Sequence, residues 1–408
     1  MPFLLVFSRT LADLTVVVVG LMFIFISSQK KDWFWLKHSW VKFNLIFWLY
    51  LLCINSPLSA DPFNSFLYGL FYIRWPLFAC ALAYWFFKDG ERQTAFLYAL
   101  CAVCAFIIAD SVWQYFSGSD FFGLAKLPSN RLTGPFKAPV PGITILRVFF
   151  IALFAILVSR YFKSITTSFW MLITLMFIGV LFMMMTGERM AFLLFMLAAA
   201  CIITGFSIEQ KIKKMNILIG ISIILISAAV LVFLSPVTAE RSIYSIAAKV
   251  GHFWQSDYGL IFRGTLEIWK DNPVFGNGLH TYKQACDEMG LLVRWGMFCS
   301  HPHNLYLLIA AETGIIGLIL FMLAVYHIYI AALKPLFSQK KWTVFALSFS
   351  ILTVCFLPFI GGISLFNNGV AALVWLGVGW TLSINNNAEL LAKNLGCSTT
   401  SSGGETLG

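Results

Sequence analysis

The sequence predicts an all-α membrane protein that crosses the bilayer many times, and three observations support this class. Of 408 residues, 60% are apolar and only 11% are charged, whereas soluble chains carry about 25% charged residues. Apolar runs such as Leu11–Ser28 and Asn216–Leu234 are long enough to cross a hydrocarbon core of roughly 30 Å. The runs lack the alternation of barrel strands, and lipid offers the backbone no hydrogen-bond partners. The spans are therefore expected to be helices.

The apolar pattern predicts eleven spans. They cover roughly residues 3–28, 42–58, 64–87, 94–116, 142–160, 167–186, 189–206, 215–235, 304–333, 343–361 and 365–384. An odd count would place the N-terminus outside the cell. Either a first helix is missing, which would give twelve, or the segment 1–28 is more complicated than one span. This segment lacks the basic start and small-residue cleavage site of a signal peptide.

Cationic residues predict the orientation of these spans, because cytoplasmic loops are enriched in lysine and arginine. If the spans alternate in direction, the cationic connections fall on one side. They contain Lys30, Lys31, Lys37, Lys42, Lys88, Arg92, Arg160, Lys163, Lys211, Lys213, Lys214, Lys334, Lys340 and Lys341, with Lys393 in the tail. We expect this side to be cytoplasmic. The net charge of +10 then reflects membrane orientation, and no nucleic-acid partner is expected.

The spans and loops divide the chain into four parts. Residues 1–235 are expected to form N-terminal transmembrane helices with a first outer loop at 117–141. Residues 236–303 form a large periplasmic loop carrying short helices, residues 304–384 form C-terminal transmembrane helices, and residues 385–408 form a disordered cytoplasmic tail. Cys286 and Cys299 share the large loop on the oxidising side, so a disulfide is plausible there, although spacing alone does not decide it.

Two histidines lie where the large loop enters the membrane, in the stretch Ser300–Tyr306. A neutral imidazole accepts a proton near pH 7, as the attack of a sugar hydroxyl on an anomeric carbon requires. This points to His303 as a catalytic base with His301 in support. Asn304 could orient its neighbour or cap the next helix. The glycines of that helix, Gly314 and Gly317, would allow close packing of another helix.

Two other interpretations of the histidines stay open. Cys299, His301 and His303 could ligate a metal, but the loop has no nearby paired carboxylates, so no metal is expected. Alternatively, both histidines could be solvated loop residues.

Three arginines are predicted on the same outer face as the histidines, against the usual bias: Arg131, Arg189 and Arg263. A guanidinium group binds two phosphate oxygens at once, so converging arginines would suit a diphosphate at the bilayer surface. Each has a simpler alternative. Arg189 could pair with Glu188, Arg263 could be a solvated helix residue, and Arg131 could cap a turn.

Two further arginines lie inside predicted spans, where an unpaired charge is costly. Arg74 is expected to pair with Asp13 or Asp110, and Arg147 could snorkel or line the outer cavity. The segment 271–280 contains one proline and two glycines, which predict a sharp turn facing the site. His280, at its end, is expected to be a surface residue.

These motifs resemble a known family. The pair His303-Asn304, followed after nine residues by Gly314-Ile315-Ile316-Gly317, resembles the signature of the bacterial O-antigen ligase family, which also includes O-antigen polymerases. The segment from Arg263 to Gly278 is similar to the one that precedes that signature, and Thr186–Ala191 resembles the family's short arginine motif. The resemblance covers about residues 60–380 and does not separate ligases from polymerases.

The resemblance implies a glycosyltransferase that takes a glycan from undecaprenyl diphosphate at the periplasmic face of the bacterial inner membrane. The acceptor would be a hydroxyl of lipid A-core in a ligase, or of another repeat unit in a polymerase. The family is thought to invert the anomeric centre without metal or cofactor. Its essential histidine matches His303, and its diphosphate-binding arginines match Arg189 and Arg263. Arg131 matches no motif, so its role rests on its charge. Family members usually have twelve spans with both ends cytoplasmic.

A non-enzymatic transporter of lipid-linked glycans is the alternative from another class. It would need polar groups through the bilayer midplane, where the headgroup must cross. The midplane of this chain is mostly aromatic and aliphatic. The sequence therefore favours an enzyme.

Overall fold

The computed structural model describes residues 1–129, 131–158, 164–234, 251–296, 299, 301–358 and 368–394. Within these ranges every regular element is a helix, and pairing between extended segments is limited to an isolated bridge between Ser119 and Ala125. Six of the helices are long and apolar enough to cross a membrane, and five shorter apolar helices accompany them. Together they cover the eleven expected spans, and the all-α membrane fold is confirmed.

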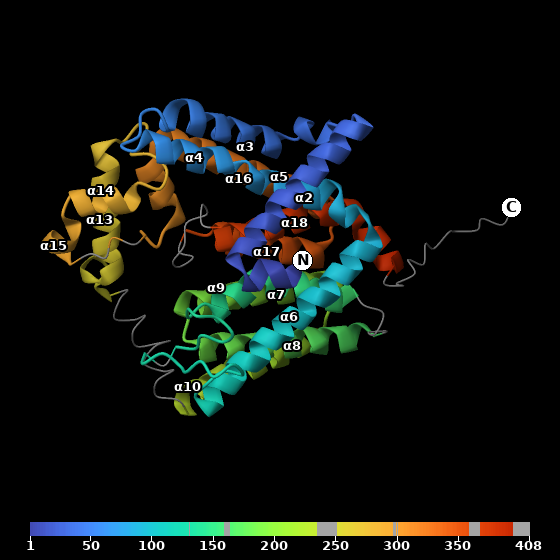
Figure 1. The fold of residues 1–408 in the computed structure, drawn as a ribbon. Helices are drawn as coiled ribbons and strands as arrows, with labels where there is room; N and C mark the ends of the chain where they lie inside the picture. Colours follow the sequence, from blue (N-terminus) through green and yellow to red (C-terminus); the bar gives the residue numbers. More distant parts are fainter. Residues whose placement is uncertain are drawn as a thin grey trace.

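The helices of the bundle follow the chain in order (Figure 1). They are α1 Pro2–Phe7, α2 Arg9–Lys30, α3 Ser39–Tyr50 with a π-helical turn at Leu51–Asn55, α4 Pro62–Tyr72, α5 Arg74–Tyr84, α6 Gly90–Ser117, α7 Pro141–Val158, α8 Ile165–Thr186, α9 Arg189–Glu209, α10 Lys214–Leu234, α16 Leu305–Ser338, α17 Trp342–Phe356 and α18 Asn368–Asn394. Helix α18 packs on α5, α17 on α9, and α3 on α16. Large aromatic side chains such as Trp75, Trp375 and Trp380 are almost fully buried between them.

The first expected span consists of two helices rather than one. Ser8 separates α1 from α2 in an extended conformation, and its hydroxyl accepts a hydrogen bond from the Leu11 amide, 3.2 Å away. A serine at this position satisfies an amide that the first turn of α2 leaves without a helical partner. Helix α1 packs against α6 and α18. The segment 1–28 is thus the more complicated of the two forms that the sequence allows.

The charge inside the α4–α5 span is paired. The Arg74 Nε atom lies 2.8 Å from the Asp13 Oδ1 atom of α2, and the Arg74 Nη1 atom donates to the carbonyl of Phe71. The expected structural pairing of Arg74 is confirmed with Asp13. Asp110, the other expected partner, accepts a hydrogen bond from the Phe121 amide instead.

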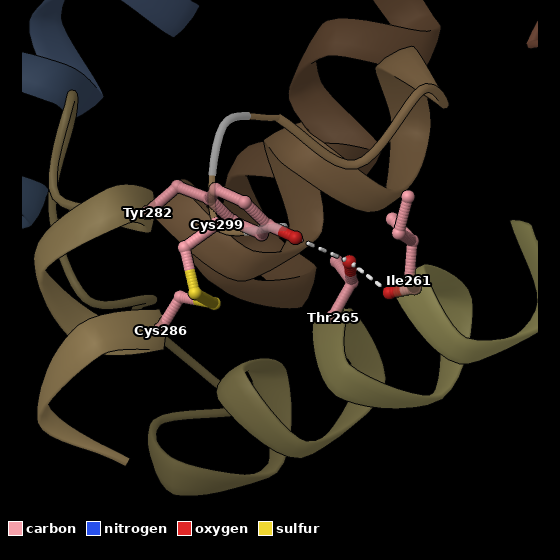
Figure 2. The surroundings of a disulfide bond; sticks show 5 residues. All are labelled: Ile261, Thr265, Tyr282, Cys286 and Cys299. Atoms are coloured by element: carbon pink, nitrogen blue, oxygen red, sulfur yellow. Dashed lines mark hydrogen bonds between the residues drawn. A yellow bond between two sulfur atoms is a disulfide. The ribbon is translucent and has the colours of Figure 1, made fainter. Parts of the chain in front are cut away.

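Three short helices of the large loop lie at one end of the bundle: α13 Asp257–Asp271, α14 Tyr282–Glu288 and α15 Leu291–Trp295 (Figure 1). They share a small core with the first turns of α16, including Ile268, Leu291 and Leu308. Figure 2 shows the disulfide between Cys286 and Cys299 beside this core. It also shows the hydrogen bond of 2.9 Å between the Thr265 and Tyr282 hydroxyls. Residues 235–250, 297, 298 and 300 of the expected loop lie outside the described residues.

The C-terminal helix is longer than its apolar core. Helix α18 continues to Asn394, so residues 385–394 of the expected disordered tail have a helical backbone. The reason is local, because Ala388, Leu390 and Leu391 are strong helix formers in a segment too polar to read as a span. Residues 395–408 lie outside the described residues.

Removing the disulfide is expected to loosen α13–α15 without unfolding the bundle. Cys286 and Cys299 are 13 residues apart, and closing a loop of this size stabilises a fold by about 3 kcal/mol. The Cys286→Ser/Cys299→Ser variant should therefore show faster amide hydrogen exchange across residues 257–295. The control is Cys53→Ser, which removes an exposed free cysteine. Unchanged exchange in the double variant would show that the loop is held by its core alone.

Candidate functional site

The turn after α13 packs into a break in α16. At Gly314 the backbone leaves the helical conformation (φ 67°, ψ −175°). The turn supplies hydrogen bonds at the break: the Ile315 amide donates to the Pro273 carbonyl at 2.9 Å, and the Gly278 amide donates to the Glu312 carbonyl at 2.8 Å. Backbone groups that lose a helical partner inside a membrane protein need another one. The turn and the broken helix therefore form a single backbone unit.

Glycines permit this contact on both sides. A Cβ atom at Gly314 would lie 2.2 Å from the Val274 carbonyl oxygen, and a Cβ atom at Gly276 would lie 2.4 Å from the Gly314 nitrogen. Both residues have positive φ angles, which glycine adopts without steric cost. The expected approach of a neighbouring helix applies to Gly317 alone, where a Cβ atom would lie 2.9 Å from the Tyr50 ring of α3. At Gly314 the turn approaches instead, because the break exposes the helix backbone there.

Three residues that sequence reasoning missed hold this unit together. The Tyr50 hydroxyl donates to the Thr313 carbonyl at 2.7 Å. The Asn55 side-chain amide donates to the carbonyls of both Phe275 and Glu312. The Glu312 carboxyl group is 4% exposed and accepts hydrogen bonds from the amides that follow the turn. A lone carboxylate inside an apolar span was a signal for Glu312, since such residues rarely lie in spans without a role.

The two histidines contact each other beside the start of α16. His301 Nε2 and His303 Nδ1 are 3.2 Å apart, and the ring of Tyr258 on α13 meets His303 edge-on at 5.4 Å between centroids. His303 has a left-handed backbone conformation (φ 51°), which turns the chain sharply before the helix. The Asn304 side chain caps α16, because its oxygen accepts from the amides of Tyr306 and Leu307.

The histidine environment favours neutral imidazoles. His301 and His303 are both half-buried, and burial lowers the pKa of His301 below its ordinary value. A neutral imidazole both donates and accepts a hydrogen bond. Cys299 is bonded to Cys286, so it has no thiolate to offer in the alternative metal site. Among the described residues, no group of histidine, cysteine and acidic side chains has an arrangement that could hold a metal ion.

A second polar group lies around Glu188, between α8 and α9. Its carboxylate accepts hydrogen bonds from the amides of Gly142 at 2.7 Å and Ile143 at 3.0 Å, at the start of α7. Burial raises the pKa of Glu188 to about 7, while these hydrogen bonds and the positive charges of Arg131 and Arg147 act in the opposite direction. Glu188 therefore holds the first turn of α7 and attracts two arginines.

The arginines around Glu188 form a group that we call the arginine cluster: Arg131, Arg147 and Arg189. Arg131 is half-buried and its Nη2 atom donates to the Pro139 carbonyl at 3.0 Å. Arg147 is only 5% exposed, so it is buried rather than snorkelling. Arg189 begins α9 and is half-buried. Within the described part of the chain, Glu188 forms no ion pair with Arg189, contrary to the simpler alternative, because its carboxylate caps α7.

Arg263 lies apart from this cluster, on the exposed side of α13. Its guanidinium group lies 5.6 Å from the centre of the Trp254 ring. The same helix carries Tyr258, which contacts His303. His280 is exposed and stacks on Tyr68 at 4.2 Å between centroids, as expected of a surface residue.

The end of α17 connects the two polar groups. On one side, the Tyr306 hydroxyl donates to the Phe356 carbonyl at 2.9 Å, two residues into α16. On the other side, Cys355 of α17 and Arg147 of α7 interact electrostatically. The structure thus brings the histidine pair and the arginine cluster to the same end of α17, on the side of the bundle that bears α13–α15 (Figure 1).

These features define a multi-pass membrane protein with a histidine pair and clustered arginines near one end of its helices. The chain belongs to the O-antigen ligase family: residues 174–322 match the family model described as O-antigen ligase. The match includes Arg189, Arg263, His303, Gly314 and Gly317, and it excludes Arg131. A comparison with curated proteins finds no match.

Family membership agrees with the resemblance found in the sequence. It points to glycan ligation or polymerisation in lipopolysaccharide biosynthesis, with lipid-linked glycan substrates. Together with the apolar helices, it indicates a multi-pass protein of a bacterial membrane.

Proposed function

We propose that the chain is a glycosyltransferase that moves a glycan from undecaprenyl diphosphate to a hydroxyl of lipid A-core, at the periplasmic face of the inner membrane. The observation that carries this proposal is the hydrogen-bond contact between His301 and His303 beside the break in α16. It provides a positioned base at the surface of a membrane domain, where the lipid-linked donor and the acceptor hydroxyl could meet.

The tautomers of the histidine pair assign a role to each ring. If His303 donates its Nδ1 proton to His301 Nε2, the His303 Nε2 atom carries a lone pair and can accept the proton of the acceptor hydroxyl. The lowered pKa of His301 keeps that ring neutral, so it remains an acceptor at pH 7. His301 is then a positioning residue, and His303 is the catalytic base.

The arginines would act on the leaving group. As the glycosidic bond breaks, negative charge develops on the lipid diphosphate, and fixed guanidinium groups stabilise that charge. Arg189, at the start of α9, and Arg263, on α13, are the candidates that belong to the family match. Arg131 would contribute through the arginine cluster. Attack on the face opposite the leaving diphosphate would invert the anomeric centre.

An assay with the purified full-length protein in nanodiscs tests the proposal. The protein receives undecaprenyl-diphosphate-linked glycan and lipid A-core, and the products are identified by mass spectrometry. Glycan joined to lipid A-core supports a ligase, and a lengthened lipid-linked glycan would identify a polymerase instead. Movement of the intact donor across the bilayer without a new glycosidic bond would identify a transporter and contradict both.

Removing either family-matched arginine is expected to weaken the use of the donor. Hydrogen bonds to charged groups contribute about 1.5–3 kcal/mol, so Arg189→Ala and Arg263→Ala should each lower kcat/KM for the donor by about 10- to 100-fold. Lysine replacements keep the charge but lose the two-pronged geometry, and they should recover only part of the activity. The measurement is initial rate against donor concentration.

Arg294→Ala is the matched control, because Arg294 lies on α15 at the same end of the bundle and pairs with Glu267 at 3.4 Å. This variant should keep nearly full activity. Full activity in both Arg189→Ala and Arg263→Ala would remove the diphosphate role from these residues.

A further inference from the structure

A cavity of about 410 Å³ lies where the last turns of α2 meet the link between α5 and α6. This place is at the opposite end of the bundle from the histidines. Helix α4 begins beside the turn, where the Ser65 hydroxyl donates to the Leu279 carbonyl, and the α4–α5 span then crosses the bundle to Lys88. The cavity therefore belongs to neither polar group of the candidate site.

The wall of the cavity is aromatic and contains a polar group that needs a partner. Trp35 is only 5% exposed and lines the cavity with Phe23 and Tyr84. Among the described residues, no acceptor forms a hydrogen bond with the Trp35 indole N–H. Buried indole nitrogens usually have an acceptor, so the cavity is suited to a ligand that offers one.

The rim of the cavity is cationic. Lys30, Lys88 and Arg92 line it together with two aspartates. The carboxylates already have partners: Asp89 caps α6 and pairs with Arg92 at 3.2 Å, and Asp32 accepts from the Phe34 amide at 3.4 Å. Within the described residues, neither Lys30 nor Lys88 forms an ion pair with a carboxylate. Two ammonium groups are thus available to an anion.

The surface beside the cavity is suited to an acyl chain. Helix α2 lines the cavity with residues at helical spacing, Phe23, Ile26, Ser27 and Lys30. The adjoining face of α2 carries exposed apolar side chains, Val18, Leu21, Met22 and Phe25. A ligand with an anionic head and an apolar tail would therefore contact both parts at once.

We propose that this cavity binds the phosphate headgroup of an anionic phospholipid, with its acyl chains along the exposed face of α2. Lys30 and Lys88 hold the phosphate, and the Trp35 indole N–H donates to one of its oxygens. Aromatic side chains next to lysines are typical of the interface between membrane and water. The proposal is independent of the reaction at the other end of the bundle.

Binding of phosphatidylglycerol to the full-length protein tests this site. The protein is titrated in zwitterionic detergent with phosphatidylglycerol or phosphatidylcholine, and bound lipids are counted by native mass spectrometry. The Lys30→Ala/Lys88→Ala variant should bind phosphatidylglycerol on the order of tenfold more weakly than the wild type. Trp35→Phe, which removes the N–H but keeps an aromatic wall, should also weaken binding. Phosphatidylcholine binding should be weak and unchanged.

The control is Lys213→Ala/Lys214→Ala, which removes two exposed lysines from the link between α9 and α10, at the same end of the bundle. It should bind phosphatidylglycerol as the wild type does. Equal binding by the wild type and the Lys30→Ala/Lys88→Ala variant overturns the proposal. Displacement of the lipid by millimolar inorganic phosphate would also overturn it, because the site would then belong to a soluble phosphate.

Discussion

Replacing His303 by alanine is expected to lower the turnover number of glycan transfer by about 10²- to 10⁴-fold, which is the usual contribution of a general base. The KM for the lipid-linked donor should change little, because the arginines that hold the diphosphate remain. His301→Ala should cause a smaller loss, since it removes the partner of His303 Nδ1 at 3.2 Å but not the base. His301→Asn, whose amide oxygen can accept the same proton, should recover part of it.

The pH profile separates a base from a merely structural histidine. A protonated His303 cannot accept a proton, so wild-type activity should fall as the pH drops through its pKa. Burial lowers the pKa of His301, so His301 stays neutral across the upper part of this decline. Residual activity in His303→Ala should lack this acid limb. An unchanged acid limb in a folded His303→Ala protein, judged by its melting temperature, would exclude His303 as the base.

Replacing Gly314 by alanine is expected to destabilise the protein more than any other single methyl addition in the site. A side chain at φ 67° and ψ −175° occupies a backbone region that is almost restricted to glycine, at a cost of about 1–3 kcal/mol. The added Cβ atom would also lie 2.2 Å from the Val274 carbonyl oxygen, so the turn must move. Thermal melting and hydrogen exchange of residues 272–282 measure the effect.

Gly290→Ala is the matched control for Gly314→Ala. Gly290 also has a positive φ angle, 61°, but a Cβ atom there would meet no atom within 4 Å. Its replacement should therefore cost only the backbone term, about 1 kcal/mol. If both variants melt at the same temperature, the contact between the turn and α16 contributes nothing to stability.

The sequence predicted the spans well because their signal is local. Long apolar runs identify helices wherever they lie in the fold, and cationic loops separate them. The breaks were harder to predict. Ser8 interrupts an apolar run with one residue, and Ile73 separates α4 from α5 without a glycine or proline at the break itself. Neither changes the hydropathy enough to reveal two helices.

The candidate site was predictable where its residues are close in sequence. His301, His303 and Asn304 lie beside one another, and the turn at 272–278 announces itself by its proline and glycines. Glu312, Tyr50 and Asn55 were missed because their roles exist only after distant segments meet. The position of Glu188 shows the same limit: its neighbour Arg189 suggested an ion pair, whereas the fold gives its carboxylate to α7, over 40 residues away in sequence.

The break in α16 also bears on the order of assembly. The carbonyls of Glu312 and Thr313 accept hydrogen bonds from Asn55, Gly278 and Tyr50, which belong to parts of the chain made long before α16. Contacts between such remote segments form late, because the chain between them must first be ordered. A membrane domain without these partners would leave polar backbone groups in lipid. The histidine pair therefore reaches its place only in a completed molecule, and a truncated or stalled chain would lack a reactive site.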